Sequence, residues 1–300
     1  MTHRRSAAAL LALAAMGVLA APAAAASAAG AATARAIPTL TEIRAGHHPG
    51  FDRLVFQFSG PVPAHRTVRY VRKVIGDASG RPILVTGNAR LEVRFSGATG
   101  HDQSGHSTYG PARRAFALPD VIQVVNAGDF EAHLGFGIGL ARKEHVHVFT
   151  LINPSRVVID VATPFRTVPV KVYLFKATAF ASGHEPFTRP VGRPVIPPAV
   201  AGGALQRLFA GPTVPDMSSG LSFLRSEATG IRVMSIHDGV ARVQLTGGCN
   251  AHGSTASIAL EIEPTLKQFS SVHWVKIYDP AGHTADPTGH SDSLPDCLNP

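Results

Sequence analysis

The sequence predicts a mostly β protein with a smaller α+β part: an N-terminal β-sandwich, then a small β-α-β-β-α-β domain. Short apolar segments that alternate with polar residues fill the first half of the chain, with Gly, Pro, Asn and Asp between them. Helical patterns occur only after residue 197. A composition of 45% hydrophobic and 16% charged residues can fill real cores, and 300 residues correspond to about two domains.

The N-terminal domain, residues 36–163, contains eight segments with strand character. They are residues 40–43, 54–58, 70–75, 91–95, 121–125, 134–140, 145–151 and 156–161. The last two flank Asn153-Pro154-Ser155, where proline disfavours helix and favours a turn, so they predict a closing hairpin. Because each strand has one face to bury, two packed sheets are expected.

The C-terminal domain, residues 168–300, opens with a strand at 168–175 and a Pro-rich segment, 186–198, without a periodic core signal. Pro198 suits the first turn of a helix that ends at Gly211-Pro212. The helix has an apolar stripe at Ala201, Ala204, Leu205 and Leu208.

Asp238-Gly239 then predicts a hairpin that joins strands 232–236 and 240–245. A second helix is expected after a cap at Ser254 or Thr255, with Pro264 kinking or splitting it. Its apolar side would carry Ala259, Ile262, Leu266 and Phe269. The last strand is expected at 272–278.

Residues 1–34 are predicted to be a secretory signal peptide. Arg4 and Arg5 precede an apolar, alanine-rich stretch and several small-x-small cleavage options. No later segment is apolar for long enough to span a bilayer. The mature protein is therefore expected to be secreted and extracytoplasmic, associated with the cell envelope and without a transmembrane segment.

Export also bears on Cys249 and Cys297, the only cysteines. An even cysteine count in an exported chain predicts a disulfide, which would pin the C-terminal tail. The other interpretations are two free thiols or a pair of metal ligands.

Positive charge is concentrated in the N-terminal domain. Residues 36–163 carry 14 basic and 10 acidic side chains, a net charge of +4. This excess favours an anionic wall polymer or a membrane surface, or simply aids solubility. No basic cluster is interleaved with stacking aromatic residues, so nucleic acid is not an expected partner.

The strand at 134–140 carries a candidate binding face. Gly135, Gly137 and Gly139 would all lie on one side and leave the backbone bare there. Either an extended polymer binds to this face, or another strand or loop packs on it. Packing is the preferred interpretation.

A polar loop, residues 96–111, carries a second candidate site. Tyr109 could stack on a sugar, while His101 and Asp102 supply hydrogen bonds. Local turn contacts are the preferred interpretation of the same residues.

No catalytic, metal or cofactor motif is present in the sequence. His145 and His147 share a strand face but lack a third ligand, and Arg156 and Asp160 are expected to form an ion pair with each other. Neither a nucleophile elbow nor a zinc-protease or phosphate-loop motif occurs. The sequence therefore predicts no enzyme, no metal and no cofactor.

Several of these motifs resemble a known family. The segment from Gly50 to Ser59, the stretch from Gly128 to Glu131 and the segment from Asn153 to Asp160 resemble an AMIN-like domain of secreted proteins from high-GC bacteria. The resemblance implies a β-sandwich associated with the cell envelope and, as in some AMIN domains, peptidoglycan binding.

The C-terminal domain is similar to a GerMN domain of sporulation and spore-germination proteins. The similarity rests on residues 204–213, Gly230-Ile-Arg-Val, residues 238–246 and Gln268-Phe-Ser-Ser-Val. It implies a non-enzymatic module that contacts other envelope proteins.

Together these features predict a non-catalytic exported envelope protein. Its AMIN-like domain would bind peptidoglycan, and its GerMN-like domain would mediate protein contacts. The alternative is a structural envelope or sporulation assembly protein in which both domains serve protein–protein interaction.

Overall fold

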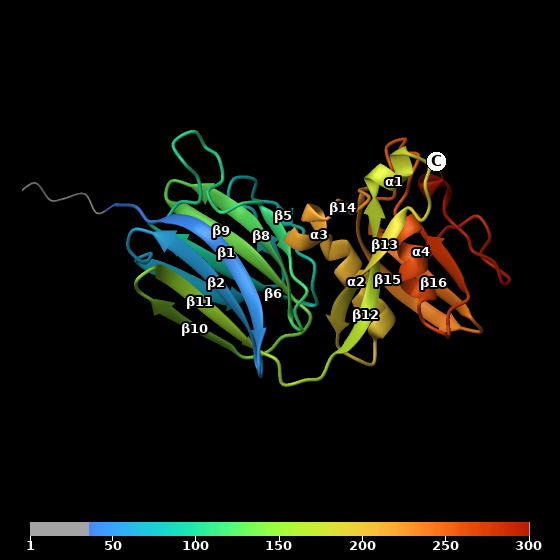
Figure 1. Ribbon diagram of the computed structural model, residues 1–300, viewed down its shortest axis with the longest axis horizontal. Coiled ribbons are helices and arrows are strands. Elements are labelled where there is room, and N and C mark those ends of the chain that lie inside the picture. The colour runs from blue at the N-terminus through green and yellow to red at the C-terminus, as the bar shows by residue number, and fades with distance from the viewer. Residues whose placement is uncertain (1–35, 300) are drawn as a thin grey trace, which may run out of the picture. The chain divides into compact units, whose positions relative to one another are not determined.

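Two antiparallel sheets packed face to face form the N-terminal part of the computed structural model, which describes residues 36–299 (Figure 1). The predicted signal peptide lies outside the described residues. The first sheet has the strand order β1-β2-β11-β10. Its strands are β1 (Thr39–His48), β2 (Phe51–Ser59), β11 (Ser155–Ala162) and β10 (Val146–Leu151).

The second sheet has five strands in the order β3-β6-β9-β8-β7. They are β3 (His65–Tyr70), β6 (Ala89–Ser96), β9 (His133–Leu140), β8 (Val121–Phe130) and β7 (Arg113–Ala115). A separate two-stranded hairpin consists of β4 (Val74–Ile75) and β5 (Pro82–Ile83). The single strand expected at 70–75 was wrong, because the chain leaves β3 at Tyr70 and starts a new hairpin at Val74.

The sandwich core lies between the two large sheets. Phe56 from β2 meets Phe95 and Phe136 with ring centroids 5.3 and 5.1 Å apart, and all three are fully buried. Leu134, Ile138 and other alternate residues face the same core, as the period of two predicted. The predicted mostly β fold class is confirmed.

The C-terminal lobe, residues 168–299, contains two three-stranded sheets. The first has the order β13-β12-β14, and the second has the order β15-β16-β17, with β16 and β17 parallel. The strands are β12 (Val168–Lys176), β13 (Thr188–Val195), β14 (Leu221–Ser222), β15 (Ala228–His237), β16 (Val240–Gly247) and β17 (Trp274–Tyr278). Asp238 and Gly239 have φ of 51° and 75°, which confirms the predicted tight hairpin between β15 and β16.

Four helices belong to this lobe: α1 (Ala177–Ala181), α2 (Val200–Ala210), α3 (Val214–Ser218) and α4 (Ala259–Lys267). Helix α2 buries the predicted apolar stripe and ends at Gly211, whose φ of 86° suits glycine. Helix α4 starts later than predicted, since Ile258 and not Ser254 or Thr255 occupies its N-cap, and it accommodates Pro264 in its interior.

The Pro-rich segment contains a strand that the sequence did not predict. Pro190 and Pro194 lie in β13, which pairs with β12 on one side only. Proline lacks the amide hydrogen of a ladder donor, and an edge strand tolerates that loss when the nitrogen faces away from the partner strand. The proline content of this segment argued against a strand, and the strand forms because β13 lies at the edge of its sheet.

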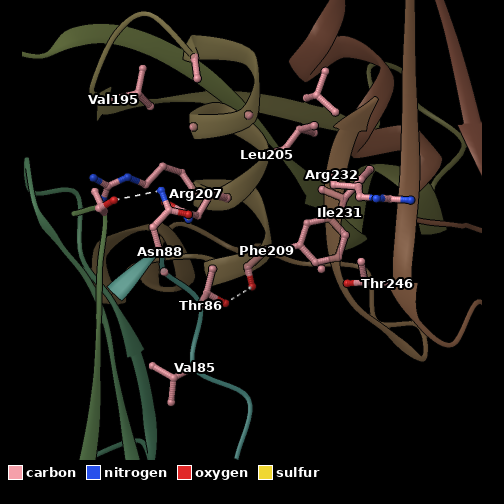
Figure 2. A pocket seen from close by; sticks show the side chains of 18 of the residues that line it. Val85, Thr86, Asn88, Val195, Leu205, Arg207, Phe209, Ile231, Arg232 and Thr246 are labelled. Carbon is pink, nitrogen blue, oxygen red and sulfur yellow. Dashed lines mark hydrogen bonds between the residues drawn. The ribbon is translucent and has the colours of Figure 1, made fainter. Parts of the chain in front are cut away.

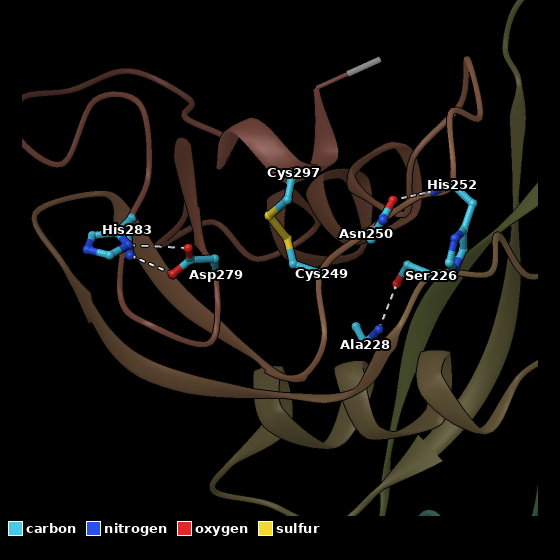
Figure 3. The surroundings of a disulfide bond; sticks show 8 residues. All are labelled: Ser226, Ala228, Cys249, Asn250, His252, Asp279, His283 and Cys297. Atoms are coloured by element: carbon cyan, nitrogen blue, oxygen red, sulfur yellow. Dashed lines mark hydrogen bonds and ion pairs between the residues drawn. A yellow bond between two sulfur atoms is a disulfide. The ribbon is translucent and has the colours of Figure 1, made fainter.

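The C-terminal tail is held to the lobe at several points. Cys249 and Cys297 form the predicted disulfide, with Cα atoms 5.7 Å apart (Figure 3). The fully buried Lys276 of β17 donates through Nζ to the Asp286 carbonyl at 2.7 Å, and Ser293 donates its amide to Val275 O. These contacts fix the residues that follow β17.

Among the described residues, no helix combines the length and the apolar character that a bilayer crossing requires.

Candidate functional site

The outward side of the four-stranded sheet carries the main candidate site, which we call the outer face. Strand registers place its side chains in rows that cross all four strands. One row contains Gly46, Arg53, Asp160 and His147, and the next contains Arg44, Val55, Val158 and Phe149. The opposite side of the same strands, with Leu54 and Phe56, fills the core. Alternation within β2 thus separates a core face from an outer one on which Phe51, Arg53 and Gln57 are half-buried and Val55 is buried.

Arg53 makes the most extensive set of contacts described on the outer face. Its Nε and Nη2 atoms each donate to one carboxylate oxygen of Asp160 at 2.7 Å. Its guanidinium carbon lies 5.0 Å from the ring centroid of Phe51 and 5.3 Å from that of Phe149. The bond to Asp160 raises the pKa of Arg53 above its ordinary value. Two aromatic rings and a bidentate ion pair therefore hold one cation at a fixed position.

Beside Arg53 the surface is hollowed by about 330 Å³. The lining residues are Arg44, Ala45, Gly46, His48, Arg53, Val55, Leu151, Arg156 and Val158. Small and aliphatic side chains thus lie alongside three arginines.

The three arginines differ in how they are bonded. Arg44 pairs with Glu42, and Arg53 pairs with Asp160. Arg156 donates only its Nε, to the Pro154 carbonyl at 3.3 Å, so its terminal nitrogens have no partner within the described part of the chain. The hollow therefore offers a free guanidinium to an anion beside a small apolar surface.

The expected ion pair between Arg156 and Asp160 was wrong. Both side chains lie on the outer face, but the register places Asp160 directly opposite Arg53. Arg156 and Asp160 lie four residues apart on the same strand, about 13 Å at ~3.3 Å per residue, whereas directly opposite residues lie about 5 Å apart, so Arg53 pairs with the carboxylate. His147, also on this face, stacks on Phe149 with ring centroids 5.2 Å apart.

The glycine strand does not offer an open face. Gly135, Gly137 and Gly139 of β9 are buried. A Cβ at Gly137 would lie 2.8 Å from both Val74 and Val85, and one at Gly139 would lie 1.9 Å from the Thr86 carbonyl oxygen. The β4–β5 hairpin and the segment after it cover this side, which supports the packing interpretation and excludes these glycines from an exposed polymer site.

The predicted loop residues separate in the structure. Tyr109 is only 6% exposed and packs on Phe136 with ring centroids 5.5 Å apart, so the expected stacking of Tyr109 on a sugar was wrong. Asp102 accepts the amides of Ser104 and His106, both at 2.9 Å, which is a local turn contact. Of the three predicted residues, His101 and Tyr109 line a common hollow of about 330 Å³, and Asp102 does not.

His101 lies in a small polar cluster that resembles a catalytic relay only superficially. Its Nδ1 is 2.7 Å from Asp129 Oδ2 and 2.9 Å from Thr99 Oγ1. A relay needs the carboxylate and the hydroxyl on different ring nitrogens, so that the imidazole can pass a proton between them. Because Asp129 and Thr99 both approach Nδ1 most closely, the geometry supports a structural role.

Sequence reasoning missed Phe51, Arg53, Arg44 and Phe149 as site residues. The signal was present, because Phe51, Arg53, Val55 and Gln57 alternate with the apolar core residues of the same strand. What the sequence could not supply was the register that brings Phe149 and Arg44 beside them.

A further hollow, of about 560 Å³, lies between the sandwich and helix α2 of the C-terminal lobe (Figure 2). Gln206 donates to Asn88 Oδ1 at 2.9 Å, and Thr86 donates to the Phe209 carbonyl at 3.5 Å across its edge. These bonds link the sandwich to the C-terminal lobe, and the described residues, 36–299, belong to one compact unit.

Next to this hollow, Arg207 of α2 reaches the sandwich. Its Nη2 donates to the Pro119 carbonyl at 2.9 Å, while Nη1 and Asp120 Oδ2 are both buried without a hydrogen-bond partner. Burial lowers the pKa of Arg207 to about 10 and raises the pKa of Asp120 to about 7. Nearby Asp52 adds to the rise at Asp120, and Arg207 opposes it.

Comparison with protein families matches one part of the chain. A family model described as the AMIN-like domain matches residues 38–163, from just before β1 to the residue after β11. The match confirms the resemblance of the N-terminal part. Comparisons with curated proteins and with solved structures return no match. The similarity of residues 168–300 to GerMN domains stays a prediction.

Proposed function

We propose that this protein is a non-catalytic, exported component of the cell envelope whose sandwich binds peptidoglycan. The AMIN-like match supports a role related to the cell wall. The disulfide supports an extracytoplasmic location, because such bonds persist in oxidising compartments. In this proposal, the C-terminal lobe contacts other envelope proteins.

The outer face is the observation that carries the proposal. Phe51 and Phe149 are half-buried rings on the outer face, and the apolar surface that Arg53, His48 and His147 leave exposed is suited to contact with sugars. Arg156 has free guanidinium nitrogens, and wall peptides present carboxylates. A glycan lying across the strands would contact the rings, while its peptide carboxylate pairs with Arg156.

Point variants of the mature protein test this site on purified peptidoglycan. We expect Phe149→Ala and Arg156→Gln each to weaken binding by about five-fold or more, because a stacking surface or an ion pair is lost. Arg66→Gln is the matched control, since Arg66 is exposed on β3 of the other sheet. Equal binding of all variants would exclude the outer face as the site.

A salt series separates the two contributions. Binding through Arg156 should weaken as ionic strength rises, whereas stacking should persist. Arg156→Gln is therefore expected to flatten the salt dependence, and Phe149→Ala to leave its slope unchanged. Wall preparations with and without phosphate-bearing polymers show whether carboxylates or phosphates are the anion.

The alternative function is a structural assembly protein in which both parts contact proteins. One observation favours it: strand β15 lies at the edge of its sheet, where another chain can pair. Concentration-dependent self-association in sedimentation experiments, without retention on purified wall, would support this alternative.

A further inference from the structure

The hollow between the sandwich and α2 is a groove with two long walls. Helix α2 provides one wall, through Gly202, Gly203 and Gln206 among others, and residues 229–233 of β15 provide another. Eleven helical residues span about 16 Å, and five strand residues span a similar distance, ~16 Å. The groove is therefore long enough for about five residues of an extended chain.

Strand β15 presents its backbone to the groove. Side chains of a strand alternate between two faces, so a hollow over one face is lined by every second residue. Here five consecutive residues line it: Thr229, Gly230, Ile231, Arg232 and Val233. Consecutive lining indicates that the hollow reaches the edge of the strand, although Thr246 of β16, opposite Gly230, also lines it.

That edge has no partner strand. The sheet order β15-β16-β17 leaves β15 paired on one side only, and no isolated bridge joins it to another described segment. An edge strand directs half of its amide and carbonyl groups away from its partner, where they can pair with an added strand.

The charged side chains around the groove favour a negatively charged ligand. Every charged residue that lines it is an arginine, namely Arg90, Arg207 and Arg232. None of the three has a carboxylate within salt-bridge distance among the described residues, and Arg207 is 2% exposed with Nη1 unpartnered. Figure 2 shows the Arg232 guanidinium turned away from Asn88 and Arg207, and it donates to Gln244 Oε1 at 2.9 Å. Asp120 and Asp52 lie near Arg207 behind the groove surface, but no carboxylate lines the groove itself, so its lining favours an anionic guest.

We propose that the groove binds an extended, acidic peptide segment of a partner protein as an added strand on β15. The peptide would pair its backbone with the free edge and place alternate apolar side chains against Leu205 and Phe209. An acidic side chain of the peptide would lie near Arg90 or Arg207. The inference rests on the protein-contact role proposed for the C-terminal lobe and names the partner class for it.

Gly202 offers a variant that fills the groove. A Cβ at this position would have only Val233 nearby, at 4.0 Å, and Val233 lies in the opposite wall. Gly202→Leu therefore adds a side chain at the groove wall whose Cβ meets no atom closer than 4.0 Å, and leucine favours helix more than glycine does. Gly192→Leu is the matched control, because a Cβ there meets nothing within 4 Å and Gly192 lies on β13, outside the groove.

The test is selection of a displayed library of random twelve-residue peptides on the wild-type protein, followed by binding of the enriched synthetic peptides. We expect enriched peptides with acidic residues among alternating apolar ones. They should bind Gly202→Leu at least ten-fold more weakly than wild type, and bind Gly192→Leu equally well. Methylation of alternate backbone nitrogens of the peptide should abolish binding, because the peptide then lacks the N–H donors that pair with the edge of β15.

The inference is overturned if no peptides are enriched. It is also overturned if the enriched peptides bind Gly202→Leu as tightly as wild type and their backbone-methylated forms bind wild type as tightly as the unmethylated peptides do. Wall binding of Gly202→Leu is measured in parallel. Loss of peptide binding with intact wall binding places the peptide site apart from the outer face. If a protein partner of the C-terminal lobe binds Gly202→Leu as well as wild type, the lobe keeps its proposed protein-contact role. The groove is then excluded as the contact site.

Discussion

At the scale of single residues, Arg53 shows how one side chain can order a surface. It bonds to Asp160 through two nitrogens and lies against two aromatic rings. Bidentate pairs fix both direction and distance, which a single charge contact does not. The outer face is organised around this one cation.

We expect Arg53→Met to destabilise the protein by about 1–3 kcal/mol, because Asp160 loses a charged hydrogen-bond partner while the aliphatic contact remains. Urea denaturation gives the free energy of unfolding. Arg44→Met is the control, since both Arg44 and Glu42 are substantially exposed and such pairs contribute at most about 1 kcal/mol. Equal losses in both variants would contradict the special role of Arg53.

Glu261 is a buried carboxyl group that makes stability depend on pH. Burial raises its pKa from 4.5 to about 8, although it accepts the amides of Phe175 and Leu224, each at 3.0 Å. A raised pKa means that the folded state holds a proton that the unfolded state releases. Stability is therefore full below pH 4.5 and decreases as pH rises toward 8, by up to about 1.4 kcal/mol per pH unit.

Glu261→Gln should flatten this decrease between pH 4.5 and 8, because glutamine does not titrate. At pH 5 the variant should be less stable than wild type, since one of the two amides loses its acceptor. Denaturation at pH 5, 6, 7 and 8 measures the effect. Asp120 titrates near pH 7 in the same direction, so Asp120→Asn serves as the comparison variant. An unchanged slope in Glu261→Gln would contradict the assignment.

At the scale of elements, strand β9 illustrates why a glycine pattern has two meanings. Bare backbone in a strand can receive a ligand or another part of the same chain. The sequence showed the glycines but not the hairpin that covers them. The β4–β5 hairpin and residues 85 and 86 occupy this face.

Gly139→Ala is expected to destabilise the protein by at least about 3 kcal/mol, because its Cβ would lie 1.9 Å from a backbone oxygen. Gly135→Ala is the milder comparison, with its nearest neighbour, Asp77 Oδ2, at 3.1 Å. Thermal unfolding of both variants measures the difference. Tolerance of alanine at 139 would mean that the covering segment can move away.

The tail is a second element whose attachment can be tested. The disulfide joins residues 48 positions apart, and closing such a loop stabilises a fold by roughly 4 kcal/mol in the chain-entropy account. Cys249→Ala with Cys297→Ala should lower stability by up to that amount. Calorimetry with and without reductant measures the loss, and the double variant should be insensitive to reductant. An equally stable variant would show that Lys276 and Ser293 hold the tail alone.

At the scale of the whole described molecule, Arg207 joins the sandwich to the C-terminal lobe through a buried polar contact. Asp120 lies near enough to interact electrostatically with Arg207, although no salt bridge joins them, and removing one of two opposite buried charges leaves the other uncompensated. Asp120 is that other charge, and it is neutral below its raised pKa of about 7.

Arg207→Met should therefore destabilise the protein by about 3 kcal/mol at pH 8 and by less at pH 5, where Asp120 carries a proton. We also expect calorimetry to separate one unfolding transition into two as the parts lose their coupling. Arg189→Met, an exposed position on β13, is the control. A loss that does not change with pH would exclude Asp120 as the partner.

The sequence by itself determined the strand alternation, the α2 stripe, the β15–β16 turn and the AMIN-like character of residues 38–163. These are local properties, because side-chain period, turn chemistry and short motifs are all written in consecutive residues. The disulfide also followed from the sequence, because only two cysteines exist.

Only the tertiary structure decided which residues meet. Register placed Asp160 opposite Arg53 and not beside Arg156, and it brought Phe149 and Arg44 onto the same face. Packing buried Tyr109 and the three glycines, and an edge position allowed prolines in β13. Pairing and burial depend on segments far apart in the chain, so the sites that rest on them cannot be read from any one segment.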